Sequence, residues 1–146
     1  MNMKTFLSIT LLAVSLNICA QSADDRKLVE QAINNYVEAF YQADTAKAYE
    51  SIAKDLAKRG YYTGKDGVVH EAKMSFEQLI RLAKRWKGSQ QLTEPLPKKI
   101  TVFDVMDKIA SAKVEAHWGI DLFHLAKIDE SWMIINVLWQ EYPPKK

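Results

Sequence analysis

Three polar residues lie inside the strongly apolar segment 119–139, and their side chains are the first candidates for chemistry: Asp121, His124 and Asn136. A neutral histidine held in a pocket can act as a general base. Successive side chains of a strand point to opposite faces, so Asp121 and His124 point apart unless a β-bulge intervenes. Each residue therefore has two interpretations, as a catalytic base or as a structural group. In the structural interpretation, His124 is half-buried and hydrogen-bonded, and Asp121 caps the turn amides after Gly119.

His124 and Asn136 are predicted to face each other. Residues 129–131, Asp-Glu-Ser, form a tight turn, and residues whose position numbers sum to about 260 then lie opposite one another in the hairpin. This register places the two side chains on one face, where each has a hydrogen-bond partner even without a ligand. We expect both at the edge of a pocket, where they tune binding, and we expect Asp121 to be mainly structural.

The other histidines form no recognisable site. His117 alternates with Lys113 and Glu115 and is expected to face solvent, and His70 is expected in a loop. Three histidines without paired spacing predict no metal site, and the sequence contains no phosphate-binding loop or nucleophile motif. We therefore expect neither a metal nor a cofactor.

Aromatic residues from several predicted elements are expected to converge. These are Tyr36, Phe40, Tyr41, Trp86, Trp118 and Trp139. In a chain of this size most of them belong to the core, but an aromatic pocket with a few polar groups suits a flat, apolar or heteroaromatic ligand. The predicted ligand-binding residues are Tyr36, Phe40, Trp86, Trp118, His124 and Asn136.

Three helices are predicted to position these side chains. Between residues 24 and 44 apolar residues recur with the spacing of an amphipathic helix. Asp44 caps a short second helix, and a third begins with a capping box of Ser75 and Gln78 and ends at Gly88. The residues expected to face inward are Ala46, Tyr49 and Ile52 in the second helix, and Phe76, Leu79, Ile80, Ala83 and Trp86 in the third.

The remaining segments are predicted to be extended. A short strand near 56–62 is followed by the turn Gly-Lys-Asp-Gly and an extended return. Four longer strands cover 100–107, 109–119, 120–129 and 132–142. Helices followed by a meander of strands predict an α+β domain, with the helices on one face of an antiparallel sheet.

Two parts of the sequence resemble a known family. The segment "KKITVFDVMDKIASAKVEAHWGIDLFHLAKIDESWMIINVLWQEYPP", and the earlier "DLAKRGYY" with "DG" and "MSFEQLI", are similar to the putative lumazine-binding family of the nuclear transport factor 2-like superfamily, also called SnoaL-like or cystatin-like. The resemblance implies three helices packed on a curved antiparallel sheet of four to six strands, forming a cone with an open pocket. The superfamily includes isomerases, dehydratases, cyclases and binding domains, and no catalytic motif of its enzymes matches this chain residue by residue.

The N-terminus is typical of a secretory signal peptide. Lys4 precedes a short apolar run over residues 6–16, and small residues follow near Ala20. We expect residues 1–20 to be removed and residues 21–146 to form a single domain that is periplasmic or secreted. Cys19 offers an alternative, because a lipidated cysteine would anchor the protein to a membrane.

The mature charge is close to neutral, since removing Lys4 from a chain of net charge +2 leaves +1. This gives no basic surplus for nucleic acid. The last strand is apolar in both phases, which predicts cover on both faces and hence a homodimer through the sheet.

The expected function is binding of a small molecule without catalysis. An isomerase, dehydratase or hydrolase that uses His124 or Asp121 as its base is the alternative, and a protein-interaction module is a further one.

Overall fold

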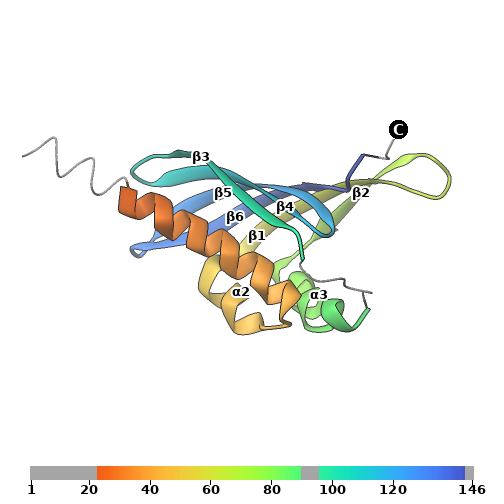
Figure 1. The fold of residues 1–146 in the computed structure, drawn as a ribbon, viewed down its shortest axis with the longest axis horizontal. Helices are drawn as coiled ribbons and strands as arrows, with labels where there is room; N and C mark the ends of the chain where they lie inside the picture. The colour runs from red at the N-terminus through yellow and green to blue at the C-terminus, as the bar shows by residue number, and fades with distance from the viewer. Residues whose placement is uncertain (1–22, 90–95, 144–146) are drawn as a thin grey trace, which may run out of the picture.

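The computed structural model describes residues 23–89 and 96–143 (Figure 1). Residues 23–41 are helical, and the elements that follow are α2 (Thr45–Ser51), β1 (Ile52–Thr63), β2 (Val69–Met74), α3 (Phe76–Ser89), β3 (Lys98–Val105), β4 (Ile109–Ala116), β5 (Gly119–Ile128) and β6 (Ser131–Gln140). The expected signal peptide, with Cys19, lies outside the described residues. No helix in the described part of the chain is long and apolar enough to cross a membrane.

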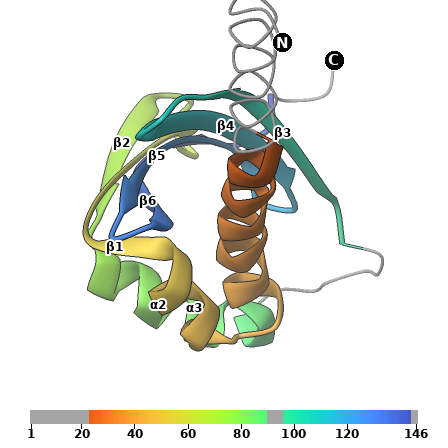
Figure 2. The ribbon, with the colours of Figure 1, turned by 90° about the vertical axis from the view of Figure 1, so that its left-hand side faces the viewer.

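The predicted α+β architecture is confirmed. Six strands form one sheet in the order β2-β1-β6-β5-β4-β3. The sheet curves around the helix of residues 23–41, and α2 and α3 lie across the open side of the curve (Figure 2). This is the expected cone, and it differs from a purely antiparallel sheet at one pair, because β1 runs parallel to β6.

The long first helix occupies the concave face of the sheet, as its apolar stripe predicts. Its buried apolar residues are Val29, Ala32, Ile33, Tyr36, Val37, Ala39, Phe40 and Tyr41. In β4 and β5, inner residues alternate with outward ones. The helix packs against the inner residues, which are Ala112, Val114, Ala116, Phe123 and Leu125. The core therefore lies between this helix and the curved sheet.

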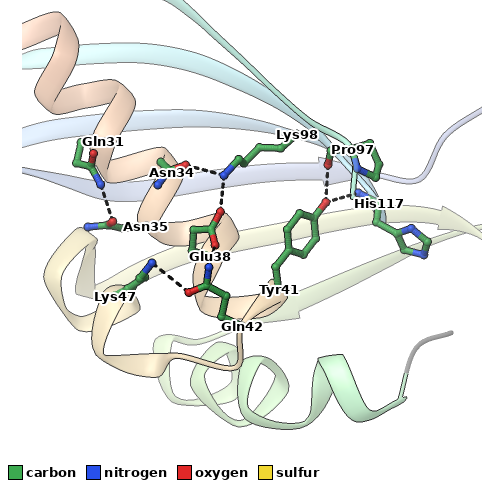
Figure 3. A network of polar contacts seen from close by, with 10 residues as sticks. All are labelled: Gln31, Asn34, Asn35, Glu38, Tyr41, Gln42, Lys47, Pro97, Lys98 and His117. Atoms are coloured by element: carbon green, nitrogen blue, oxygen red, sulfur yellow. Dashed lines mark hydrogen bonds and ion pairs between the residues drawn. The ribbon is translucent and has the colours of Figure 1, made fainter. Parts of the chain in front are cut away.

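Polar contacts fix the end of the first helix to the sheet (Figure 3). The Tyr41 hydroxyl donates to the Pro97 carbonyl at 2.5 Å and accepts from the His117 amide at 2.9 Å. Lys98, at the start of β3, donates to Asn34 at 2.8 Å and also pairs with Glu38. These contacts hold the helix against both β3 and the turn between β4 and β5.

Register shifts interrupt three of the strand pairs, and one of them lies in the β1–β6 pair, between Ile52 and Ala57. Between β5 and β6 the pairing changes between His124 and Leu125, which leaves Ile135 as the extra residue of a bulge. A similar shift in β3 leaves Phe103 unpaired. A bulge increases local twist and changes which side chains point outward.

The local helix signals are confirmed more fully than the helix boundaries. Ser75 and Gln78 make the predicted capping box, with the Ser75 amide donating to the Gln78 side chain at 2.7 Å. All five inward residues predicted for α3 are buried, but α3 continues past Gly88 to Ser89.

The predicted phase of α2 is wrong. Asp44 does cap α2, but Ala48 and Ser51 are its buried residues, whereas Tyr49 is 55% exposed. Ile52 is buried as predicted, but it already belongs to β1 and not to this helix. His70 belongs to the edge strand β2, not to a loop.

Candidate functional site

Asp121 lies at the centre of a polar cluster on the inner face of the sheet. Its Oδ1 accepts from Lys58 Nζ at 3.0 Å. Its Oδ2 accepts from Trp118 Nε1 at 2.7 Å and from the Tyr36 hydroxyl at 3.3 Å. Lys58 also donates to the Tyr36 oxygen at 2.5 Å, so the four side chains form a closed network.

This network is shielded from solvent. Asp121 and Tyr36 are fully buried, and the Lys58 side chain is only 10% exposed. Burial raises the pKa of the Tyr36 phenol well above its ordinary value, and the adjacent Asp121 carboxylate raises it further. Tyr36 is therefore a neutral donor, and the charges of Lys58 and Asp121 balance each other.

Trp118 and Tyr36 also belong to a group of five aromatic rings, in which Trp118 lies beside the other four. Its ring centroid lies 5.1 Å from Phe40, 5.3 Å from Trp86, 5.5 Å from Tyr41 and 6.3 Å from Tyr36. Trp118 itself is half-buried in the turn before β5. Five of the six aromatics predicted to converge therefore do so, with Trp118 the most exposed of the five, whereas the ring contact of Trp139 is with Tyr62.

Lys58 was not among the candidates predicted from the sequence. In β1 the residues Leu56, Lys58 and Gly60 alternate inward, which is the signal that could have drawn attention to a lysine on an apolar face. Its ammonium reaches Asp121, 63 positions later in the chain. A pocket of about 380 Å³ opens beside Lys58, with Arg59, Lys73, Ser75 and Gln78 among its lining residues.

Trp139 also faces inward, directly across from Asp121 in the β5–β6 pairing. It lies over Gly60, where a Cβ atom would come within 2.3 Å of the indole Cε3. The ring lies 6.5 Å from that of Tyr62. Gly60 therefore provides the space that this indole occupies on the sheet.

His124 and Asn136 are paired as predicted, but on the other face of the sheet. They are cross-strand partners, and Asn136 Nδ2 lies 3.2 Å from His124 Nδ1. His124 is exposed, and it lines a pocket of about 290 Å³ on the outer face with Met106, Ile109 and Ile135.

The six residues predicted to bind a ligand therefore fall into two groups. Tyr36, Phe40, Trp86 and Trp118 lie together on the inner side, whereas His124 and Asn136 lie on the outer side. Asp121, expected to be mainly structural, belongs to the inner group. The predicted separation of Asp121 from His124 is confirmed, since the bulge falls beyond His124 and does not bring them together.

A second buried carboxylate provides a comparison at the opposite end of the first helix. Asp25 accepts from Trp132 Nε1 and from Lys127 Nζ, both at 3.0 Å. The hydrogen bond from Trp132 lowers the pKa of Asp25, and the hydrogen bond and charge of Lys127 lower it further, against the opposing effect of burial. This cluster ties the helix to the β5–β6 hairpin.

The donor chemistry around Asp121 is that of a buried ion pair. In the described residues no group of three or more histidine, cysteine or carboxylate side chains is placed to hold a metal ion. A lysine, two aromatic donors and one carboxylate are instead arranged to satisfy one another.

Comparison with known proteins identifies the family. The family model described as putative lumazine-binding matches residues 24–140. The chain belongs to the putative lumazine-binding family. No protein of the curated set matches the chain.

Solved structures similar to this family member share its fold. A nuclear transport factor 2-like protein from Methylobacillus flagellatus is 24% identical, with a TM-score of 0.63 over 84% of this chain and 95% of that one. One from Shewanella baltica is 15% identical, with a TM-score of 0.60 over 83% and 96%. One from Novosphingobium aromaticivorans is 16% identical, with a TM-score of 0.60 over 93% and 91%.

The first two of these proteins are described as being of unknown function. At such identities the similarity establishes the nuclear transport factor 2-like fold, also described as cystatin-like, and it leaves chemistry to be argued from the residues of the putative lumazine-binding protein itself.

Proposed function

We propose that this protein is an exported domain that binds a small, flat, apolar or heteroaromatic molecule in the interior of its cone, without catalysing a reaction. One observation carries the proposal: a fully buried carboxylate, Asp121, is held by Lys58, Tyr36 and Trp118 beneath a group of aromatic rings. Such a combination of aromatic walls and few, fixed polar groups is typical of small-molecule pockets. The description of the family points to the same class of ligand.

The hydrogen bonding of Asp121 favours binding over proton abstraction. A general base needs a free lone pair directed at the substrate. Both oxygens of Asp121 already accept hydrogen bonds, and one of them faces the Lys58 ammonium at 3.0 Å. These contacts occupy the oxygens that a general base would have to direct at a substrate.

The position of His124 also argues against the enzymatic alternative. Its imidazole lies on the outer face, where its hydrogen-bond partner is the amide of Asn136. Asp121, the other candidate base, points to the opposite side of the sheet. An enzyme that combined them would need two separate pockets for one substrate.

The outer face supports a further proposal, that two copies of the chain associate through the sheet. Apolar side chains that are at least 42% exposed lie along its strands: Phe103, Ile109, Leu122 and Leu138. Burying exposed apolar side chains against a second copy is favourable. The His124–Asn136 pair lies within this surface and would be covered in the dimer.

Two tryptophans provide a matched test of the interior site. Trp118 and Trp132 both donate an indole N–H to a buried aspartate, but only Trp118 belongs to the proposed site. The mature wild-type protein is purified from the periplasm, and its bound small molecules are identified by native mass spectrometry. We expect Trp118→Phe to lose most of the co-purifying molecule, and Trp132→Phe to retain it while unfolding at a lower temperature.

Equal retention by the two variants would contradict the interior location. A wild-type protein that carries no small molecule, and whose melting temperature is unchanged by every member of a library of flat aromatic compounds, would contradict the binding function itself.

A further inference from the structure

The indole N–H of Trp139 is a buried donor without a protein acceptor. Among the described residues it is the one buried side-chain nitrogen or oxygen that has no hydrogen-bond partner. By contrast, the indole N–H groups of Trp118 and Trp132 each reach a carboxylate. Buried donors are nearly always paired in folded proteins, so an unpaired one requires an explanation.

Trp139 occupies the inner face beside the proposed ligand site. It is the cross-strand partner of Asp121, whose carboxylate accepts hydrogen bonds from Lys58, Tyr36 and Trp118. Trp139 therefore lies next to Asp121 across the β5–β6 pair, and Trp118 contacts the same residue from the turn before β5. The donor and the aromatic cluster thus belong to one region of the cone.

The orientation of the indole ring directs its N–H away from β1. The atoms nearest to Gly60 are Cε3, Cζ3 and Cδ2, which lie along one long edge of the indole. Nε1 belongs to the opposite edge. Because Gly60 has no side chain, the ring lies close over β1, with its nitrogen-bearing edge farther from Gly60 than the Cε3–Cζ3 edge.

The charges in this region indicate a neutral partner for the donor. The Asp121 carboxylate is balanced by Lys58 at 3.0 Å, and Tyr36 is kept neutral by the raised pKa of its phenol. No uncompensated charge among these residues would attract an ionic group. Tyr62, 6.5 Å from Trp139, adds a second ring beside the donor.

We propose that the Trp139 indole N–H donates a hydrogen bond to the bound ligand, and that the ligand is a neutral, flat heteroaromatic molecule with a carbonyl oxygen or ring nitrogen at that point. This inference rests on the proposed function and adds Trp139 as the residue that selects for ligands with a hydrogen-bond acceptor. An apolar hydrocarbon of the same shape fills the same space but leaves the donor unpaired, so the site discriminates against it.

Quinoline and naphthalene are matched probes for this selection, because they share a bicyclic shape and differ by one ring nitrogen. Their dissociation constants are measured for the wild type, for Trp139→Phe and for the control Trp132→Phe. We expect the wild type and Trp132→Phe to bind quinoline about three- to tenfold more tightly than naphthalene, the contribution of one neutral hydrogen bond. Trp139→Phe should bind the two probes with equal affinity.

A second measurement requires no variant that has to fold. In a ¹H–¹⁵N correlation spectrum of the wild type, quinoline should shift the indole resonance of Trp139 downfield, and naphthalene should not. Equal affinity of the wild type for both probes, with no such shift, would overturn the inference and leave the binding function standing. Failure of both probes to bind the wild type would overturn the inference as well, whereas the binding function fails only if no small molecule co-purifies and the compound library leaves the melting temperature unchanged.

Discussion

Removing the Lys58 ammonium should destabilise the protein strongly, because it leaves the Asp121 carboxylate buried without a counter-ion. Lys58→Met keeps most of the aliphatic stem and deletes only the charge and its two hydrogen bonds, to Asp121 at 3.0 Å and to Tyr36 at 2.5 Å. The Lys58 side chain is 10% exposed and that of Asp121 is fully buried. Solvent therefore cannot replace the lost partner.

The expected cost is about 3–5 kcal/mol, which is the penalty for removing one member of a buried ion pair. This is a large share of the roughly 5–15 kcal/mol that stabilises a domain of this kind. Urea unfolding followed by far-ultraviolet circular dichroism measures the change without relying on tryptophan signals near the site. Lys113→Met is the control, because its pair with Glu115 lies on the surface and should contribute far less.

A double-mutant cycle separates the unpaired charge from other effects of the substitution. Asp121→Asn removes the carboxylate charge but keeps an oxygen for the Trp118 N–H. The double variant Lys58→Met/Asp121→Asn should therefore be more stable than Lys58→Met alone, despite carrying one more substitution. A cost of less than about 1 kcal/mol for Lys58→Met, or simple additivity in the double variant, would refute the reasoning.

Four further outcomes are expected. Asp25→Asn should lower the stability at neutral pH. Because folding lowers the pKa of Asp25, the stability difference from the wild type should shrink as the pH falls from the unfolded-state pKa through the folded-state pKa. Urea titrations across acidic pH would detect this change. Leu138→Lys should convert a homodimer into a monomer by light scattering, and a monomeric wild type would rule the dimer out. His124→Ala and Asn136→Ala should couple in stability by about 0.5–1 kcal/mol; coupling in ligand affinity instead would assign the pair to a binding site. N-terminal sequencing of the exported protein should begin at Gln21, and an intact leader would contradict export.

Local signals in the sequence predict local structure well. The capping box of Ser75 and Gln78 depends on residues three positions apart, and the hairpin register that pairs His124 with Asn136 follows from a short turn. The bulge at Ile135 could not be predicted in the same way. Inward and outward side chains alternate on both sides of it, and the bulge only shifts this alternation by one residue. The seven residues of α2 are too few to show a helical period in the sequence. Packing therefore decides which side of this helix is buried.

The site depends on contacts between distant parts of the chain, which local patterns do not contain. Aromatic content predicted that Tyr36 and Trp118 converge, since large apolar rings gather in any core. The pairing of Lys58 with Asp121 required β1 and β5 to approach the same helix with both side chains turned inward. Nothing in either segment specifies the other, and so the sequence predicted a mainly structural role for Asp121.

The parallel pairing of β1 with β6 has a consequence for the order in which the protein folds. β6 is the last described strand in the chain, yet it lies in the interior of the sheet between β1 and β5. The two halves of the sheet therefore cannot join until β6 has been synthesised, and Lys58 cannot meet Asp121 in a fixed geometry before then. Contacts of such long sequence separation slow folding, and sheet-rich domains fold in about milliseconds to seconds. A ribosome-bound chain that ends before β6 should remain sensitive to protease, and it should become resistant only after this strand emerges.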